Sequence, residues 1–417
     1  MNNNGKANRV LAASTFSFTV CFAVWMMFAV LGIPIKQMLD LNETQFGLLA
    51  AMPVLSGALV RVPLGIWTDR YGGRIVFFAV MLATVIPVAL IGRATQYWQF
   101  LALGLLLGLA GGSFAVGTPY VARWFPKERK GLAMGIFGAG NSGSALTKFV
   151  APGIIATWGW QALPGVYAAA LLATALLFWV CSATDPAHNV QSTASFTGQL
   201  RVLKDRRVWR YCQYYSVIFG GYVGLALWMT KYYVAEYGFD LGLAALLAAC
   251  FSLPGGVLRA LGGWVSDRYG AYKVTWWVMW VCWVCFFLLS YPPTSMQVKT
   301  VDGALAVDLA LSPWVFTALL FVAGTAMAIG KASVFKFIGD EFPDNIGAVS
   351  GVVGLAGGLG GFILPILFGA LLDVTGVRSS AFMLLYGTVC VSLVWMHFSF
   401  RPVGAAPARM PAAVAAH

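Results

Sequence analysis

The amino-acid sequence predicts an all-α integral membrane protein with twelve transmembrane helices in two pseudo-symmetric halves of six helices each. Of its 417 residues, 59% are hydrophobic and only 10% are charged, whereas soluble proteins carry about 25% charged residues. Apolar runs long enough to cross a bilayer recur along the chain, and a motif of the first half returns in the second. We therefore exclude a soluble enzyme, a disordered chain, a secreted disulfide scaffold and a transmembrane β-barrel.

Each expected span is an apolar run of roughly 20 residues or more, bounded by charge, Gly or Pro. In chain order the spans cover 10–35, 45–68, 74–92, 98–122, 131–157, 162–183, 208–234, 241–266, 273–291, 313–339, 347–372 and 379–400. The first run is too long for the core of a signal peptide and no small-residue cleavage site follows it, so we interpret it as a span.

The longest polar stretch between spans lies in the middle of the chain. It predicts an N-terminal half over 1–183, a linker over 184–207, a C-terminal half over 208–402 and a tail over 403–417. A weaker polar insert, 292–312, joins the ninth and tenth spans.

The distribution of Lys and Arg predicts the orientation in the membrane. With the N-terminus in the cytoplasm, seventeen of the 27 Lys and Arg residues fall on the cytoplasmic side, five outside and five within spans. Cytoplasmic loops carry an excess of these residues. The charge distribution therefore predicts that both termini and the linker lie in the cytoplasm. We also expect the protein to be a monomer in the cell's inner (plasma) membrane. The net charge of +12 follows from this distribution and does not indicate nucleic-acid binding.

The most informative feature is the set of charges inside the expected spans. None of the fifteen acidic residues lies within a span. The five cations that do are Arg61, Lys148, Arg259, Lys331 and Lys336. A charge in the hydrocarbon region is costly, so each needs a partner, a water-filled cavity or a route to the surface. Because no buried acid is available, we expect the partner to be a mobile anion.

The cysteines and histidines indicate neither a metal site nor a catalytic site. All seven cysteines lie in or beside apolar runs, including Cys282 and Cys285 with their CxxC spacing. We interpret them as packing residues and expect no metal site and no cofactor. The spans contain no acid and only His397, so they offer no catalytic constellation for an enzyme.

An internal repeat relates the two halves. Segments 61–72 and 259–270 share Arg, Gly, Asp, Arg, Tyr and Gly at a constant offset of 198 (259 minus 61). The Phe-Pro step at 125–126 is echoed at 342–343, and spans five and eleven are both glycine-rich. Duplicated halves with a substrate site between them are typical of secondary transporters.

Residues 65–74, GIWTDRYGGR, resemble the loop signature of the major facilitator superfamily, and 263–270 is the second-half copy. The resemblance implies the fold of that superfamily and transport by alternating access. An Asp at a helix end that faces basic neighbours forms a cytoplasmic latch that can break and reform. The residues expected to act in gating are Asp69, Arg70, Asp267 and Arg268.

Within that superfamily, residues 138–152 resemble the nitrate signature of the nitrate/nitrite porter family, and 354–362 resembles its second-half partner. The resemblance covers nearly the whole chain. It implies transport of a small monovalent oxyanion, nitrate or nitrite, gripped by one arginine from each half, and these map onto Arg61 and Arg259. It also implies an aromatic wall, which maps onto Phe114, Tyr215 and Phe219.

The positions of the two arginines suit this role. Each lies eight residues before a helix-end Asp, which is ~12 Å along a helix and near the middle of a ~30 Å core. Two guanidinium groups present planar forks of N–H donors that match a planar oxyanion. Asn141 can add an amide donor, and the rings of Tyr215 and Phe219, four residues apart on one helix face, can exclude water.

Three lysines depart from the family pattern, in which neutral residues stand at these positions. We expect Lys148 and Lys331 in the substrate site, whereas Lys336, four residues before Asp340, can equally reach the cytoplasm. The extra charge leaves the substrate open. The alternative to nitrate and nitrite is a small carboxylate, exchanged as in the oxalate/formate antiporters.

The coupling also stays open. We favour nitrate/nitrite exchange, because two permanently charged arginines make an empty cavity costly to move and a bound anion lowers that charge. Burial beside other cations disfavours the charged form of a lysine. Nitrate–proton symport through Lys148 or Lys331 is therefore the alternative.

Overall fold

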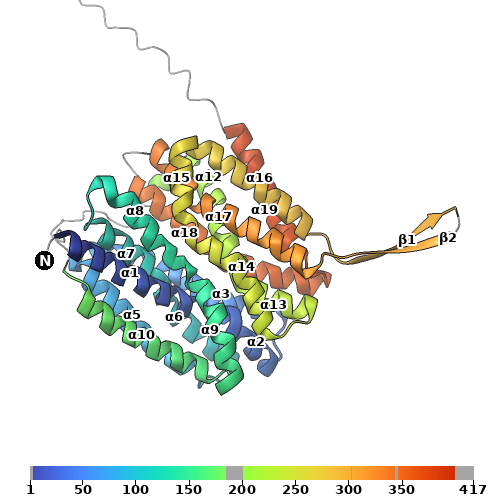
Figure 1. Ribbon diagram of the computed structural model, residues 1–417, viewed down its shortest axis with the longest axis horizontal. Coiled ribbons are helices and arrows are strands. Elements are labelled where there is room, and N and C mark those ends of the chain that lie inside the picture. The colour runs from blue at the N-terminus through green and yellow to red at the C-terminus, as the bar shows by residue number, and fades with distance from the viewer. Residues whose placement is uncertain (1–2, 185–200, 302, 343–345, 400–417) are drawn as a thin grey trace, which may run out of the picture.

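The computed structural model describes residues 3–184, 201–301, 303–342 and 346–399. These form an elongated bundle of helices with one projecting β-hairpin (Figure 1). The predicted tail and most of the predicted linker lie outside the described residues, so the boundaries of the two halves stay a prediction.

Described residues 3–184 form ten α-helices, several of which continue one another across a short break. They are α1 (Asn3–Trp25), α2 (Phe28–Leu39), α3 (Glu43–Leu59), α4 (Arg61–Tyr71), α5 (Gly73–Ile91), α6 (Tyr97–Leu107), α7 (Ser113–Ala122), α8 (Lys127–Gly138), α9 (Gly143–Trp158) and α10 (Ala162–Cys181). Two 3₁₀ turns, η1 (Gly108–Gly112) and η2 (Ala139–Ser142), connect α6 to α7 and α8 to α9.

The described residues from 201 onward repeat this pattern. Their helices are α12 (Arg206–Tyr215), α13 (Gly221–Tyr237), α14 (Leu241–Val257), α15 (Arg259–Tyr269), α16 (Ala271–Leu289), α17 (Pro313–Glu341), α18 (Ile346–Thr375) and α19 (Ser380–Ser399). A 3₁₀ turn, η3 (Arg201–Lys204), precedes α12, and a π-helical turn, η4 (Ser216–Gly220), joins α12 to α13. The predicted polar insert forms an antiparallel hairpin of β1 (Thr294–Thr300) and β2 (Gly303–Leu309).

The bundle is suited to a membrane, although the count of twelve spans stays a prediction. In the described ranges, eight helices or continuous helix series are long and apolar enough to cross a bilayer, or ten when each of two bent pairs is counted as one span. The two remaining expected spans, 131–157 and 208–234, correspond to the series α8–η2–α9 and α12–η4–α13, each interrupted near its middle.

The two bent spans turn at the predicted arginines. Helices α3 and α4 meet at 41°, and α14 and α15 meet at 49°. Arg61 and Arg259 are the first residues after these bends. Pro63 lacks the N–H that would bond to the carbonyl of Leu59, where α3 ends. At the second bend, glycines at 255–256 and 262–263 flank the break.

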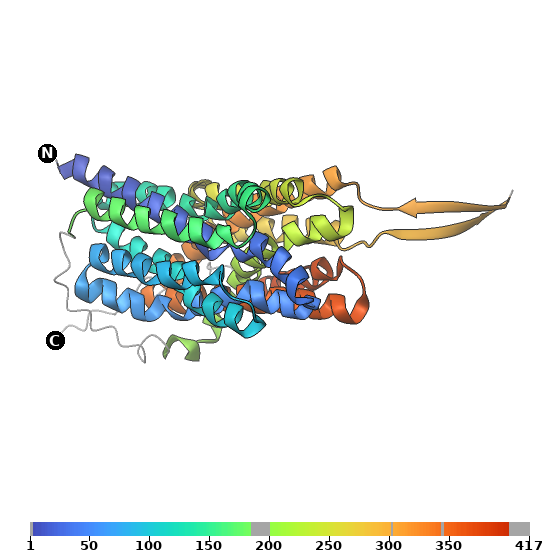
Figure 2. The same cartoon turned by 90° about the horizontal axis from the view of Figure 1, so that it is seen from below.

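The bundle has two distinct ends (Figure 2). We call the end at which α1 begins and α10 finishes the linker end, and the opposite end, from which β1 and β2 project, the hairpin end. Helices α1–α10, blue to green in Figure 1, gather largely on one side, and α12–α19, lime to red, on the other.

The two halves pack tightly along two seams, α3 against α18 and α9 against α14. Small residues permit this approach. A Cβ added to Gly358 would lie 2.5 Å from the Cβ of Ala58, and one added to Gly135 would lie 2.9 Å from the Cβ of Ala260. The glycine-rich segments predicted in spans five and eleven therefore lie at the contact between the halves.

Candidate functional site

A small, narrow cavity lies between the two halves. Its lining residues are Phe18, Phe22, Arg61, Gly111, Phe114, Asn141, Tyr215, Phe219 and Arg259. The structure thus brings together six of the eight residues predicted to bind substrate. We call this space the arginine cavity.

Most of the residues that define the cavity stand at interruptions of regular α-helix. Arg61 and Arg259 follow the two bends, and Phe114 follows the turn η1. Asn141 lies within the turn η2, and Phe219 within the π-helical turn η4. Short non-α turns change the direction of side chains and often occur at functional sites. The chain therefore uses irregular backbone where it lines the cavity, as expected inside a membrane protein.

Each arginine reaches across to the opposite half. The Cζ atom of Arg61 lies 5.4 Å from the ring centroid of Phe219, and Arg61 Nη1 donates to the carbonyl of Gly354 at 3.3 Å. The Cζ atom of Arg259 lies 5.0 Å from the ring centroid of Phe114. A Cβ added to Gly138 would stand 3.4 Å from Arg259 Cδ. Both glycine-rich signatures thus adjoin the arginine of the other half.

Among the residues that the structure describes, no carboxylate neutralises the charge of the cavity. Within the described residues, neither Arg61 nor Arg259 forms an ion pair with a carboxylate. The Nε of Arg61 is buried and has no hydrogen-bond partner. A buried N–H without an acceptor is costly, so the cavity is suited to a small anion that accepts hydrogen bonds.

The aromatic and amide groups complete the wall. Tyr215 and Phe219 stack with ring centroids 5.2 Å apart at 5° between planes, and Phe335 meets Tyr215 edge-on at 4.9 Å. Asn141 donates one amide N–H to the carbonyl of Gly138 at 2.9 Å. An amide carries two such donors, so one stays available to the cavity.

The two predicted lysines do not line this cavity. Lys148 and Lys331 are fully buried and lie around the ring of Tyr222 instead. Lys148 Nζ donates to Ser252 Oγ at 2.7 Å, and Lys331 Nζ donates to the carbonyl of Gly255 at 2.7 Å. Lys336 lies instead near the linker end, where its Nζ pairs with Asp340 at 2.5 Å, in agreement with the alternative that it reaches toward the cytoplasm.

A larger cavity leads from the arginine cavity toward the linker end. Arg61, Phe114 and Tyr215 line both, and the larger one extends along α4 and α18 to Asp69. At the opposite, hairpin end, side chains of the two halves join. Lys231 pairs with Glu43, and Asp373 accepts hydrogen bonds from the backbone of Thr44 at 2.9 Å and from its hydroxyl at 2.6 Å.

The predicted gating residues differ between the halves. Asp69 pairs with Arg123, while the Arg70 guanidinium lies 5.3 Å from the ring of Tyr71. In the part of the chain that the structure describes, Asp267 forms no ion pair. Arg268 lies 5.8 Å from the ring of Trp264.

A sequence difference explains this asymmetry. The Phe-Pro echo relates the ends of the fourth and tenth spans by an offset of 217 (342 minus 125), which matches Arg123 with Asp340. The position that holds a base in the first half therefore holds an acid in the second half. At this end of the C-terminal half, Arg210 pairs with Glu341 instead, and Tyr211 also donates to that carboxylate.

The start of α12, outside the expected spans, carries a further ion pair at the linker end. Asp205 caps this helix by accepting from the backbone of Arg207 at 2.9 Å. The hydrogen-bonded Arg207 guanidinium lowers the pKa of the Asp205 carboxyl. This pair stabilises the first turn of α12, where the C-terminal half begins.

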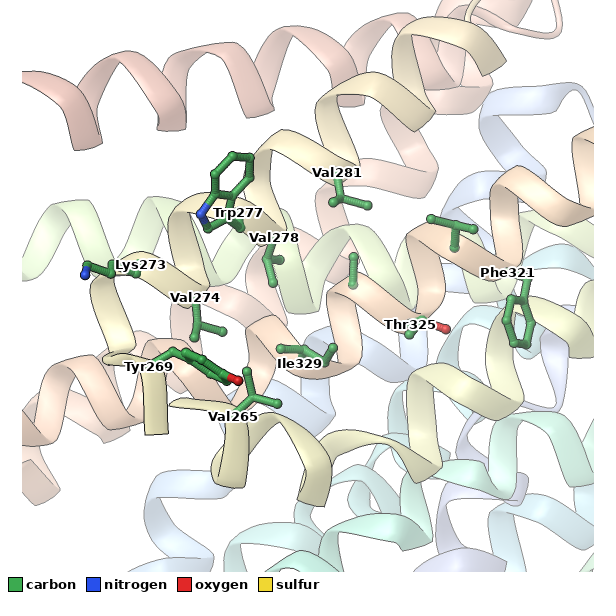
Figure 3. Close-up of a pocket in the computed structure, with 12 residues that line it drawn as sticks. Val265, Tyr269, Lys273, Val274, Trp277, Val278, Val281, Phe321, Thr325 and Ile329 are labelled. Atoms are coloured by element: carbon green, nitrogen blue, oxygen red, sulfur yellow. The ribbon is translucent and has the colours of Figure 1, made fainter. Parts of the chain in front are cut away.

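A wide pocket between α15, α16 and α17 is not suited to an anion (Figure 3). Its wall is mostly apolar and includes Val265, Trp277 and Phe321. The one charged lining residue, Lys273, lies at its edge with the ammonium group pointing away (Figure 3). A small anion would gain no hydrogen-bonded pair there.

Comparison with known proteins agrees with this architecture. The family model of the Major Facilitator Superfamily matches residues 13–365. Among solved structures, the nucleoside transporter NupG (D323A mutant) aligns with a TM-score of 0.73 at 15% identity, over 94% of this chain and 100% of NupG. A bacterial homologue of the lysosomal transporter Spinster, in an inward-facing conformation, aligns with a TM-score of 0.67 at 16% identity, over 94% of this chain and 95% of the homologue. The chain is a multi-pass membrane transporter and belongs to the major facilitator superfamily.

Curated relatives define a narrower group. The probable nitrate/nitrite antiporter NarK1 of Thermus thermophilus is 40% identical over 94% of this chain and 91% of its own length. The probable nitrate/nitrite transporter NarK2 of Mycobacterium tuberculosis is 31% identical over 93% and 95%. The nitrite extrusion protein of Bacillus subtilis is 29% identical over 94% and 95%. Within the superfamily, the chain belongs to the nitrate/nitrite porter family, as its paired glycine signatures predict.

Proposed function

We propose that this protein carries nitrate and nitrite across the inner (plasma) membrane by alternating access, most simply by exchanging one for the other. It works as a monomer in the lipid bilayer, and the halves 1–183 and 208–402 rock about the arginine cavity. The termini and the linker face the cytoplasm, so the linker end is the cytoplasmic end. The relatives named for nitrate and nitrite support the choice of substrate.

The observation that carries this proposal is the pair of guanidinium groups in one cavity. They come from opposite halves, and within the described residues they have no carboxylate partner. The Nε of Arg61 is buried without a hydrogen-bond partner, so a ligand that accepts a hydrogen bond there would be stabilised. A planar monovalent oxyanion can accept from both forks at once and fits between aromatic faces.

The arrangement also fits alternating access. Contacts between the halves close the hairpin side, while a cavity continues from Arg61 toward Asp69 at the linker end. With the proposed orientation, this is an inward-facing state. Opening of the hairpin side in exchange for closure at the linker end would turn the arginine cavity to the outside.

Exchange is favoured by the charge of the cavity. Arginine stays protonated at any accessible pH, so the empty cavity carries about two positive charges that must move through a low-dielectric region. A bound anion reduces this charge and eases the transition. Lys148 and Lys331, the groups that proton symport would use, lie outside the arginine cavity and have neutral hydrogen-bond partners.

The test is anion flux in proteoliposomes that contain the purified protein. Nitrate uptake should require nitrite inside the vesicles and should change little with an inward proton gradient. Robust uptake into vesicles without internal nitrite, driven by the proton gradient, would overturn exchange in favour of symport. Uptake of oxalate or formate in the absence of nitrate uptake would overturn the proposed substrate and favour small-carboxylate exchange.

A further inference from the structure

A second buried group of polar residues lies beside the arginine cavity. It consists of Ser144 and Lys148 on α9, Tyr222 on α13, Ser252 on α14 and Lys331 on α17, and we call it the lysine layer. Lys148 Nζ donates to Ser252 Oγ at 2.7 Å, and the Tyr222 hydroxyl donates to the Ser252 carbonyl at 2.8 Å. Lys331 Nζ lies 3.1 Å from the centroid of the Tyr222 ring.

The lysine layer stands on the hairpin side of the arginine cavity. Lys148 follows Asn141 by seven residues on a segment that runs toward the hairpin end, and Ser252 precedes Arg259 by seven on a segment that runs away from it. Seven residues span ~10 Å of helix and return to nearly the same face. An anion that enters between the halves from the hairpin end would therefore meet this layer before the arginines.

The layer also holds the two halves together. Lys148 and Ser144 belong to the N-terminal half, whereas Ser252 and Tyr222 belong to the C-terminal half. The bond from Lys148 to Ser252 and the 3.2 Å contact between the Ser144 and Tyr222 hydroxyls both cross the seam. When the halves separate on the hairpin side, these two contacts must break.

The two lysines respond differently to that separation. Lys331 keeps its partners, the Gly255 carbonyl and the Tyr222 ring, because all three belong to the C-terminal half. Lys148 loses Ser252 and keeps only the Ser144 carbonyl, at 3.4 Å. Among the described residues, Lys148 has no carboxylate partner that could replace Ser252. A buried ammonium that loses its acceptor needs a new one.

We propose that Lys148 receives the incoming monovalent oxyanion at the gate on the hairpin side. When this gate opens, its ammonium group exchanges the Ser252 hydroxyl for the anion. When the gate closes, the anion moves on to Arg61 and Arg259, and Lys148 returns to Ser252. The inference rests on the proposed function and adds a residue that acts from one side of the membrane only.

The test measures nitrate KM separately on the two sides, in proteoliposomes with the protein in a single orientation. Lys148→Gln should raise the KM at the hairpin side about tenfold or more, the effect of one lost charge-assisted hydrogen bond. At the linker side the KM should change less than twofold, because Lys148 is occupied by Ser252 in that state. Lys336→Gln is the matched control, since Lys336 pairs with Asp340 outside the layer, and it should change neither value.

A second variant should change the hairpin-side KM in the opposite direction. Ser252→Ala keeps the ammonium but removes the acceptor that stabilises the closed gate, so the gate opens more readily and the hairpin-side KM should fall. Equal changes on both sides for Lys148→Gln, or a rise for Ser252→Ala, would overturn the inference while leaving nitrate transport intact. Failure of the unmodified protein to transport nitrate from either side would overturn the proposed function and this inference together.

Discussion

The substitution of lysine for Arg61 or Arg259 tests whether the arginine cavity binds the anion by geometry as well as by charge. Lysine keeps the positive charge but replaces five donors in a planar fork with three on one nitrogen. Arg61 uses Nη1 for the carbonyl of Gly354 and leaves Nε unpaired. A single Nζ cannot serve both positions, so Arg61→Lys should lose at least one bond to the anion.

The expected magnitude follows from that count. A hydrogen bond to a charged group contributes about 1.5–3 kcal/mol, which is roughly a 10- to 150-fold change in Kd. Arg259→Lys should lose a similar amount, since its guanidinium lies over Phe114 and a compact ammonium would not keep the same stacking. The retained charge keeps both losses toward the lower end of the range.

Nitrate titration of the purified protein by calorimetry measures this loss directly. Arg93→Lys, an exposed arginine, is the matched control and should leave Kd unchanged. Size-exclusion elution as a single symmetric peak checks that each variant is folded. Near-normal nitrate affinity in both cavity variants would refute the reasoning and move the site elsewhere.

Three further predictions concern topology and gating. Cysteines introduced at Asn189, which lies outside the described residues, and at Met296 in the hairpin should label from opposite sides of the membrane; labelling from one side would contradict the six-plus-six arrangement. Asp69→Asn should lower turnover at least severalfold and change nitrate Kd less than twofold, because it breaks the pair with Arg123 at the linker end and not the cavity; a pure loss of affinity would argue against a latch. Asp373→Ala removes the side chain that caps the start of α3, worth about 1 kcal/mol. This change should favour opening at the hairpin end about fivefold. The measurement is the alkylation rate, from that side, of a cysteine introduced into the cavity. An unchanged rate would contradict the role of Asp373 in closing the hairpin end.

The sequence predicted the depth of the two arginines but not the backbone that carries them. Their distance from the helix-end acids places both near mid-membrane, and the structure brings them into one cavity. The bends that begin at Arg61 and Arg259 were not predicted. Pro63 identifies one of them in retrospect, whereas the other follows Pro254 and the glycines at 255–256, and glycines are frequent throughout this chain.

The structure places Lys148 outside the arginine cavity, and its assignment to the substrate site stays a prediction. Seven residues after Asn141, Lys148 faces nearly the same way but lies two turns closer to the hairpin end. Likewise Lys331 precedes Phe335 by one turn. Partners distant in sequence, such as Arg123 for Asp69, could not be predicted because the packing of separate helices decides them.

The ion pairs at the two ends indicate how the protein can switch between inward-facing and outward-facing states at a small cost in free energy. At the linker end, Asp69 and Arg123 both belong to the N-terminal half, so their pair does not cross between the halves. At the hairpin end, the pair of Glu43 with Lys231 crosses between the halves and must break when that end opens.

Each partner of the pair that breaks has a substitute in its own half. Glu43 already lies 3.6 Å from Lys36, and the Lys231 ammonium lies 4.2 Å from the ring centroid of Trp228. A charge that exchanges one partner for another avoids most of the penalty of an unpaired buried ion. Within the described residues, Lys148 keeps only the Ser144 carbonyl of its own half, at 3.4 Å, and has no carboxylate partner. We therefore infer that the anion is the partner of Lys148 in the outward-open state, and we expect opening of the hairpin side to be coupled to the presence of substrate there.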